Sequence, residues 1–161
     1  LFRSDSSLKT VQKSYYINTF SDQIVITKIS ANGSAVYVRY PSSTSSTGYR
    51  TKWFRTIDII GMTYIYAAFA AGFATGYCYP YSAPSKLTVY RMSSATQVKS
   101  YGSIAKGGSC VALGYRTISG TAYIPTIYPI SATKVLGITV KYKLALSTKY
   151  CKNADYTLKI Y

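Results

Sequence analysis

Short runs of alternating hydrophobic and polar residues recur along the chain, and turn-forming residues separate them. In the first half these runs cover residues 1–3, 23–29, 35–40 and 51–56. In the second half they cover residues 87–91, 109–113, 122–128 and 135–142. Alternation with a period of two is typical of β-strands, and the intervening Asn-Gly, Gly-Gly and Ser-Gly pairs favour tight turns. The sequence therefore predicts an all-β fold of short antiparallel strands.

The two halves carry similar residues in the same order. The segment Val36–Ser42 resembles Ile124–Ile130, and both are apolar strands that contain a Tyr-Pro pair. The shorter runs Ile24–Ile26 and Cys110–Ala112 also correspond, at nearly the same spacing. Matching order with nearly constant spacing indicates an internal duplication. We expect two tandem small barrels, the first over residues 1–60 and the second over residues 87–146.

The segment between the two copies carries no charge from residue 59 to residue 85 and is rich in Ala, Gly and Phe. It is long enough for a membrane span, but Thr, Tyr and Pro dilute it, and a span would place two copies of one domain on opposite sides of a membrane. We therefore expect no membrane span. Residues 61–86 are predicted to be a buried connector with a short helix near residues 67–74, and residues 147–161 a C-terminal tail or closing strand.

The charges are strongly unbalanced, with 19 Lys and Arg residues against four acids and no His. The acids are Asp5, Asp22, Asp58 and Asp155, so the chain contains no Glu. General acid–base catalysis usually uses His or a tuned carboxylate, and glycoside hydrolysis needs two carboxylates close together. We therefore expect no enzyme, no catalytic residue and no cofactor.

The three cysteines have no Cys-x-x-Cys spacing, and with no His in the chain a zinc site is not expected. Cys110 aligns with Ile24 in the repeat, so we expect a buried thiol that behaves as a small hydrophobe. Cys78 and Cys151 lie outside the repeated segments. If the chain has a disulfide, it is expected to join these two; the sequence leaves open whether they pair.

The net charge of +15 indicates an anionic partner, which could be a nucleic acid, a teichoic acid, an anionic wall glycan or acidic lipid headgroups. The chain also carries 19 Tyr residues. A tyrosine ring has an apolar face and a polar hydroxyl, which suits contact with sugars and peptides. The chain begins without Met or a signal-like segment, so we expect a mature or excised part of a longer protein.

Several motifs resemble the bacterial SH3-like (SH3b) repeats of phage endolysins and Gram-positive wall hydrolases. In the second copy they are the runs at residues 90–94, 102–107 and 111–114, followed by Tyr128-Pro129. In the first copy the closest match is the closing segment Gly48–Phe54. The second copy departs from the pattern at residues 134–138, where an aromatic residue would be usual, and the first copy lacks the Gly-rich turn.

The resemblance implies two SH3-like barrels that form a non-catalytic targeting module for peptidoglycan or attached anionic wall polymers. Such a module acts outside the cell at the bacterial wall, is made in the host cytoplasm if it belongs to a phage lysin, and accompanies a catalytic domain, usually N-terminal, in the full-length protein. We expect the ligand to contact an aromatic and basic set of side chains: Tyr37, Tyr40, Tyr49, Arg50, Lys52, Trp53, Tyr123 and Tyr128.

Alternatives stay open at this point. Trp53 could be a core residue of its barrel instead of a ligand contact. A virion or surface structural protein could use the same fold for assembly, and the chain could form a homo-oligomer. Tyr interleaved with Lys and Arg on a small β-barrel is also typical of single-stranded nucleic-acid binders, although no RNP-like run or Arg-rich tract is present.

Overall fold

The computed structural model describes residues 17–18, 20–30, 34–59, 64–68, 79–82, 85–112 and 116–147, and for residues 57, 79–82, 109–112 and 116 the backbone alone. The strands of the first half are β1 (Gln23–Ile29), β2 (Ala35–Pro41), β3 (Tyr49–Arg55), β4 (Tyr64–Ala67) and β5 (Tyr79–Ser82). Those of the second half are β6 (Leu87–Met92), β7 (Val98–Ile104), β8 (Ser109–Ala112), β9 (Arg116–Ile118), β10 (Thr121–Val135) and β11 (Ile138–Ser147). The helix described is the four-residue α1 (Thr56–Ile59).

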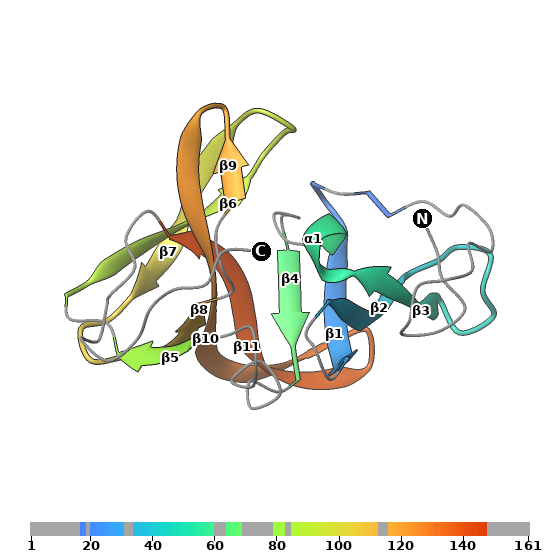
Figure 1. Ribbon diagram of the computed structural model, residues 1–161. Helices are drawn as coiled ribbons and strands as arrows, with labels where there is room; N and C mark the ends of the chain where they lie inside the picture. The colour runs from blue at the N-terminus through green and yellow to red at the C-terminus, as the bar shows by residue number, and fades with distance from the viewer. Residues whose placement is uncertain are drawn as a thin grey trace.

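These strands form one 11-stranded sheet with the order β3-β2-β1-β4-β11-β10-β8-β5. Strand β6 pairs with β11 and β7, and β9 pairs with β10 (Figure 1). The all-β prediction is confirmed. Two tandem barrels are not confirmed, because the sheet continues from the strands of the first half into those of the second.

Strand β4 makes this connection. It pairs in parallel with β1, where Ile24 lies opposite Ile65, and antiparallel with β11, where Leu144 lies opposite Ile65. The expected connector over residues 61–86 therefore contains a central strand of the sheet. The short helix predicted to start at Ala67 is wrong at that residue, which ends β4; residues 69–78 lie outside the described part. The alternating Tyr-Ile-Tyr-Ala run forms a strand because β1 on one side and β11 on the other offer backbone donors and acceptors that need partners.

Several other strand predictions are confirmed, and some are corrected. Strand β1 has the bounds that the alternation predicts, and turns occur at both expected Gly-containing pairs: one spans residues 105–108 and the other lies at residues 119–120. The expected strand over residues 135–142 is interrupted by a two-residue turn at Leu136 and Gly137, whose φ angles of 50° and 76° fit a type I′ hairpin. Strands β7 and β9 were not predicted, and residues 1–3 and the Asn32-Gly33 pair lie outside the described part.

Two groups of three adjacent strands share one register. In the first unit (β1, β2 and β3) Val25 lies opposite Arg39 and Tyr40 lies opposite Arg50. In the second unit (β8, β10 and β11) the aligned Val111 lies opposite Ile127, and the aligned Tyr128 lies opposite Lys143. The two Tyr-Pro pairs thus occupy the same place in two similar arrangements of strands. Duplication of a three-stranded unit would produce this shared register.

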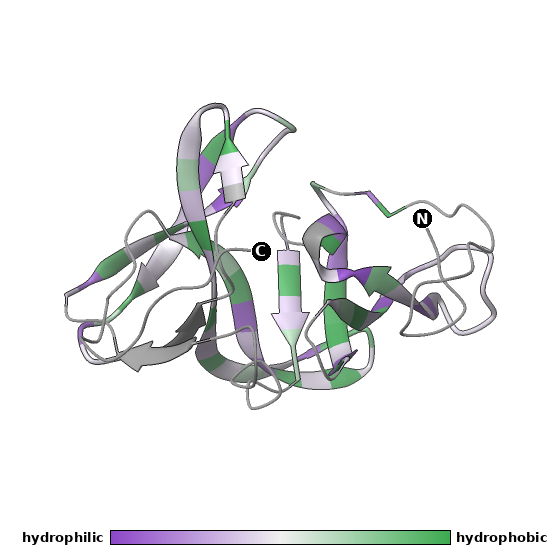
Figure 2. Ribbon diagram, viewed as in Figure 1, coloured by the Kyte–Doolittle hydropathy of each residue, from purple (hydrophilic) through white to green (hydrophobic). Residues whose placement is uncertain are grey.

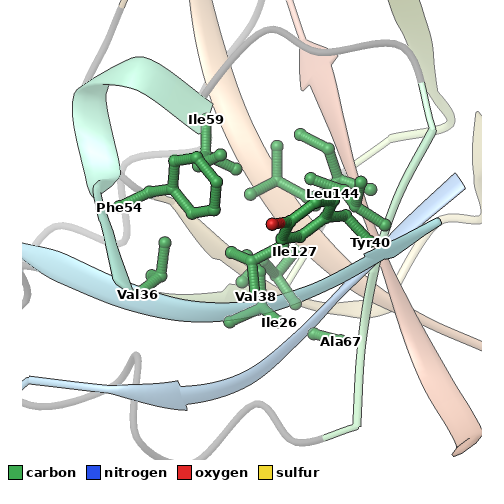
Figure 3. Packing of buried hydrophobic residues seen from close by; sticks show 11 residues of the cluster. Ile26, Val36, Val38, Tyr40, Phe54, Ile59, Ala67, Ile127 and Leu144 are labelled. Atoms are coloured by element: carbon green, nitrogen blue, oxygen red, sulfur yellow. The ribbon is translucent and has the colours of Figure 1, made fainter. Parts of the chain in front are cut away.

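The largest core cluster is built from both halves of the chain. From the first unit and α1 it takes Ile24, Ile26, Val36, Val38, Tyr40, Phe54 and Ile59, and from the strands beyond it takes Ile65, Ala67, Ile127 and Leu144. Figure 3 shows these side chains gathered between the strands, and the hydrophobic run of β1 that contributes to them is visible in Figure 2. Burial of so many aliphatic side chains from distant segments is the main force that holds the two halves together.

We predict that Ile65→Ala destabilises the whole molecule and not one half of it. Ile65 is 1% exposed in the shared core, and truncation of a buried Ile typically costs about 2–5 kcal/mol. Urea unfolding should be followed through the fluorescence of Trp53 in the first unit and through far-ultraviolet circular dichroism of the whole sheet. Both transitions should coincide and shift together.

The control is Thr133→Ala, which removes an exposed side chain from β10 and should leave both midpoints unchanged. Two separated transitions in the unmodified protein would show that the halves fold independently, in contradiction to the shared core.

Candidate functional site

One face of the first unit lies in the shared core, and the other is covered at Val25 of β1 by Val135 and Val140 and is partly exposed over β2 and β3. Val36, Val38 and Tyr40 of β2 point inward, so the residues between them point outward. The outer face, as we call it, consists of Lys28, Tyr37, Arg39, Tyr49, Thr51 and Trp53. Each of these side chains is exposed or partly exposed.

Tyr37 and Trp53 form the aromatic centre of the outer face. They lie opposite each other on β2 and β3, and their ring centroids are 5.2 Å apart at an interplanar angle of 44°. The Tyr37 hydroxyl donates a hydrogen bond to Oγ1 of Thr51 at 3.0 Å, which fixes the orientation of its ring. Trp53 is partly exposed and belongs to none of the buried clusters, so it is not a core residue.

Arg39 lies beside this aromatic pair. Its guanidinium carbon is 3.9 Å from the centroid of the Tyr49 ring, and Nη1 donates to the carbonyl oxygen of Leu136 at 3.0 Å. Leu136 belongs to the β10–β11 turn, which thereby reaches the outer face. The buried Nε of Arg39 has no hydrogen-bond partner within the described ranges. The planar cation is held on an aromatic ring.

Little negative charge opposes these cations. Lys28 lies 5.4 Å from the centroid of Tyr37. Of the two carboxylates in the described part of the chain, Asp58 pairs with Arg55 at 2.8 Å and Asp22 accepts a hydrogen bond from the backbone nitrogen of Asn18 at 2.7 Å. The hydrogen bond from Arg55 to Asp58 raises the pKa of Arg55. The outer face is left with a positive potential.

The other expected ligand residues do not lie on the outer face. Arg50 and Lys52 alternate with Thr51 and Trp53 on β3, so they point to the inner side, where Arg50 donates to the hydroxyls of Ser42 and Thr44. Tyr40 is 1% exposed and packs edge-on against Phe54. The expectation that Tyr40 contacts ligand is corrected, because its ring lies in the core.

The two tyrosines predicted from the second half are also placed elsewhere. Tyr128 is 9% exposed and packs with Leu87, Val89 and Ile104, so a surface role for it is corrected as well. Tyr123 is partly exposed and lies edge-on to Tyr90 at 6.1 Å. It belongs to the part of β10 that pairs with β9, away from β3 in the sheet order (Figure 1).

The structure brings together a second aromatic and basic group that the sequence does not predict. This tyrosine cluster consists of Tyr64, Tyr66, Arg91, Tyr101 and Lys143. Lys143 lies 5.4 Å from the centroid of Tyr66 and 4.8 Å from that of Tyr101, and Arg91 lies 5.2 Å from that of Tyr64. The residues come from β4, the neighbouring strands β6 and β7, and β11, which span residues 64–147, so no local pattern could have indicated them.

Burial governs the acid–base behaviour of the phenols in and beside this cluster. It raises the pKa values of Tyr66 and Tyr101, and together with the nearby Tyr101 and Tyr66 it raises the pKa of Tyr128 to about 12. These phenols remain neutral at physiological pH. The two cations in the cluster therefore face aromatic rings and not phenolates.

The duplicated register allows a direct comparison of the two outer faces. The outer-face residues Tyr37, Arg39, Thr51 and Trp53 correspond in register to Pro125, Ile127, Leu144 and Leu146 of the second unit. All four of the latter are apolar in their side chains and buried. The same positions are therefore packing residues in one unit and a partly exposed aromatic and cationic surface in the other.

The outer face combines flat aromatic rings with cationic side chains. Within the described ranges there is no group of three His, Cys, Asp or Glu residues that could hold a metal ion. No helix among these residues has the length and apolarity to cross a bilayer. Cys78 and Cys151 lie outside the described residues, and for Cys110 the structure gives the backbone, which pairs with Tyr81 of β5.

No protein-family model, no curated protein and no solved structure matches the chain.

We predict that Tyr128 titrates late in alkaline solution, well above an ordinary tyrosine. Its pKa is about 12, because burial disfavours the phenolate. The folded pKa lies above the unfolded value, so this group stabilises the fold fully below about pH 10 and loses that contribution as the pH rises through about 12. Phenolate absorbance of the native protein should show this late step.

The variant Tyr128→Phe should lack the late step while it retains the packing of the ring. An unchanged titration curve in this variant would contradict the assignment to Tyr128.

Proposed function

We propose that the chain is a non-catalytic module that binds an anionic polymer of the Gram-positive cell wall, such as peptidoglycan with attached teichoic acid, through the outer face of β1, β2 and β3. In this proposal the module acts outside the cell. It directs the longer protein of which it is a part, and which carries a separate catalytic domain, to the wall. The proposal combines the sequence resemblance with the charge of the chain and the geometry of that surface.

The observation that carries the proposal is the Tyr37–Trp53 pair beside Arg39 on a sheet surface that the second unit fills with apolar residues. The apolar faces of sugar rings stack on flat aromatic rings such as these. The guanidinium of Arg39 and the ammonium of Lys28 attract phosphate or carboxylate groups along a polymer. Because neighbouring strands hold these groups, little side-chain freedom is lost on binding.

Composition supports a role without catalysis. The chain offers four Asp residues, no Glu and no His for general acid–base chemistry. Of the acids in the described part, Asp58 is engaged by Arg55, and Asp22 caps a turn through Asn18. Neither lies on the outer face.

Single-stranded nucleic acid is the second candidate, and the same observation favours it. Bases stack on Tyr and Trp rings while cations follow the phosphates, and such binding is largely independent of sequence. Competition decides between the two ligands: binding to purified walls should resist an excess of single-stranded DNA of mixed sequence if the wall polymer is the ligand.

We predict that Trp53→Ala weakens binding to purified Gram-positive walls by about 1–3 kcal/mol, because it removes one stacking surface of the site. Tyr37→Ala should have a similar effect. The measurement is a sedimentation assay with walls at several salt concentrations. Binding should also weaken as salt rises, since the cations of the outer face are partly exposed to solvent.

Tyr123→Ala provides the matched control, since it removes a partly exposed tyrosine outside the outer face. It should bind walls as the unmodified chain does. Equal losses for Trp53→Ala and Tyr123→Ala would show that the outer face is not the site. Release of soluble wall fragments by the chain alone would contradict the non-catalytic role.

A further inference from the structure

Strand β3 is the last strand of the sheet on its side. It pairs along its whole length with β2, from Tyr49 opposite Pro41 to Arg55 opposite Ala35. Among the described residues no strand pairs with its other edge. An unpaired edge presents a row of backbone donors and acceptors to any extended chain.

The backbone pattern of β3 tells which residues point to that edge. The nitrogen of Thr56 donates to the carbonyl of Ser34, and the nitrogen of Ser42 donates to the carbonyl of Gly48, each at 2.9 Å. Bonded pairs alternate along an antiparallel ladder. Arg50, Lys52 and Phe54 therefore bond to β2, whereas the N–H and C=O groups of Tyr49, Thr51 and Trp53 face away from it.

In the second unit, the edge that corresponds to the open edge of β3 is covered by another strand. In the second unit, β11 takes the place of β3, with Tyr142 and Lys143 in the register positions of Tyr49 and Arg50. The outer edge of β11 is covered by an added antiparallel strand, β4, in which Tyr66 lies opposite Lys143. The corresponding edge of β3 has the same pattern of backbone groups, and no strand of the described ranges covers it.

Charge determines which kind of strand fits. Arg50 and Lys52 would stand beside the residues directly opposite them on an added strand, and like charges at such positions repel. Two β3 edges from two copies would bring these cations together. No segment of a second copy supplies acids in alternation either, because Asp5, Asp22, Asp58 and Asp155 are far apart in the sequence.

We propose that β3 binds an extended acidic segment of a partner protein as an added antiparallel strand. Acidic side chains of the segment lie beside Arg50 and Lys52, and its alternate apolar side chains lie beside Tyr49, Thr51 and Trp53. Backbone hydrogen bonds to Thr51 and Trp53 hold the segment, and the alternating charge selects it. This protein partner is distinct from the polymer proposed for the outer face.

The test uses a synthetic peptide of alternating Glu and Val and the full chain. Amide hydrogen exchange is followed by nuclear magnetic resonance. In the free chain the amide of Lys52 should be protected and those of Thr51 and Trp53 should exchange fast. The peptide should slow exchange at Thr51 and Trp53, and a peptide of alternating Lys and Val should not.

A matched pair of variants isolates the backbone bond. Thr51→Pro removes the outward N–H, which a strand edge tolerates, whereas Thr51→Ala removes the same side chain and keeps the N–H. Thr51→Pro should bind the Glu–Val peptide about tenfold more weakly than Thr51→Ala, as expected for one backbone hydrogen bond. Both variants should unfold at similar urea concentrations.

Four results would overturn the proposal. They are no binding of the Glu–Val peptide, binding without protection of Thr51 and Trp53, equal affinity of the two Thr51 variants, and protection of these amides in the free chain. Protection that grows with protein concentration would identify a second copy at the edge, and protection independent of concentration a segment of the same chain. Wall binding is measured separately, so its loss or retention does not affect this outcome.

Discussion

The pairing of β4 on both of its edges is the constraint on which the rest of the sheet depends. This short strand lies between β1, which runs parallel to it, and β11, which runs antiparallel. A buried strand must satisfy its backbone donors and acceptors on both sides, and here each side belongs to a different half of the chain. Ile65 and Ala67 also lie in the core that both halves share. Without β4, two strand edges would be unpaired and that core would open.

This arrangement gives the two similar units different surroundings. The outer side of the second unit packs Ile127 and Leu144 into the shared core, whereas the corresponding Arg39 and Thr51 of the first unit remain at the surface. One set of backbone positions thus serves packing in one unit and forms a partly exposed aromatic and cationic surface in the other. Aromatic and cationic residues can occupy these positions in the first unit because the positions are partly exposed there, whereas in the second unit they are buried.

Alternation and turn residues suffice to predict the class of the fold, most strand positions and the correspondence of the two Tyr-Pro strands. In β3 they do not indicate which face is buried, because polar, basic and aromatic residues occupy both sides of that strand. Tyr40 and Trp53 belong to neighbouring strands and look equally suited to a ligand, yet one lies in the core and the other outside it. The role of β4 and the cluster around Lys143 depend on pairing between segments far apart in the sequence, which local propensity does not encode. The proximity of Tyr37, Tyr49 and Trp53 could be predicted, because they lie on the adjacent strands β2 and β3.

The position of β4 also has a consequence for the order of events during synthesis. Strands β1 to β4 emerge from the ribosome first, while β11, which closes the other edge of β4, is among the last parts of the described chain to be made. Pairing over such a sequence distance is slow to form, because a long loop must close before the contact is gained. Until then β4 has an open edge with the uncharged sequence Tyr-Ile-Tyr-Ala. The high net charge of the chain then repels neighbouring nascent chains during the interval in which that edge is open.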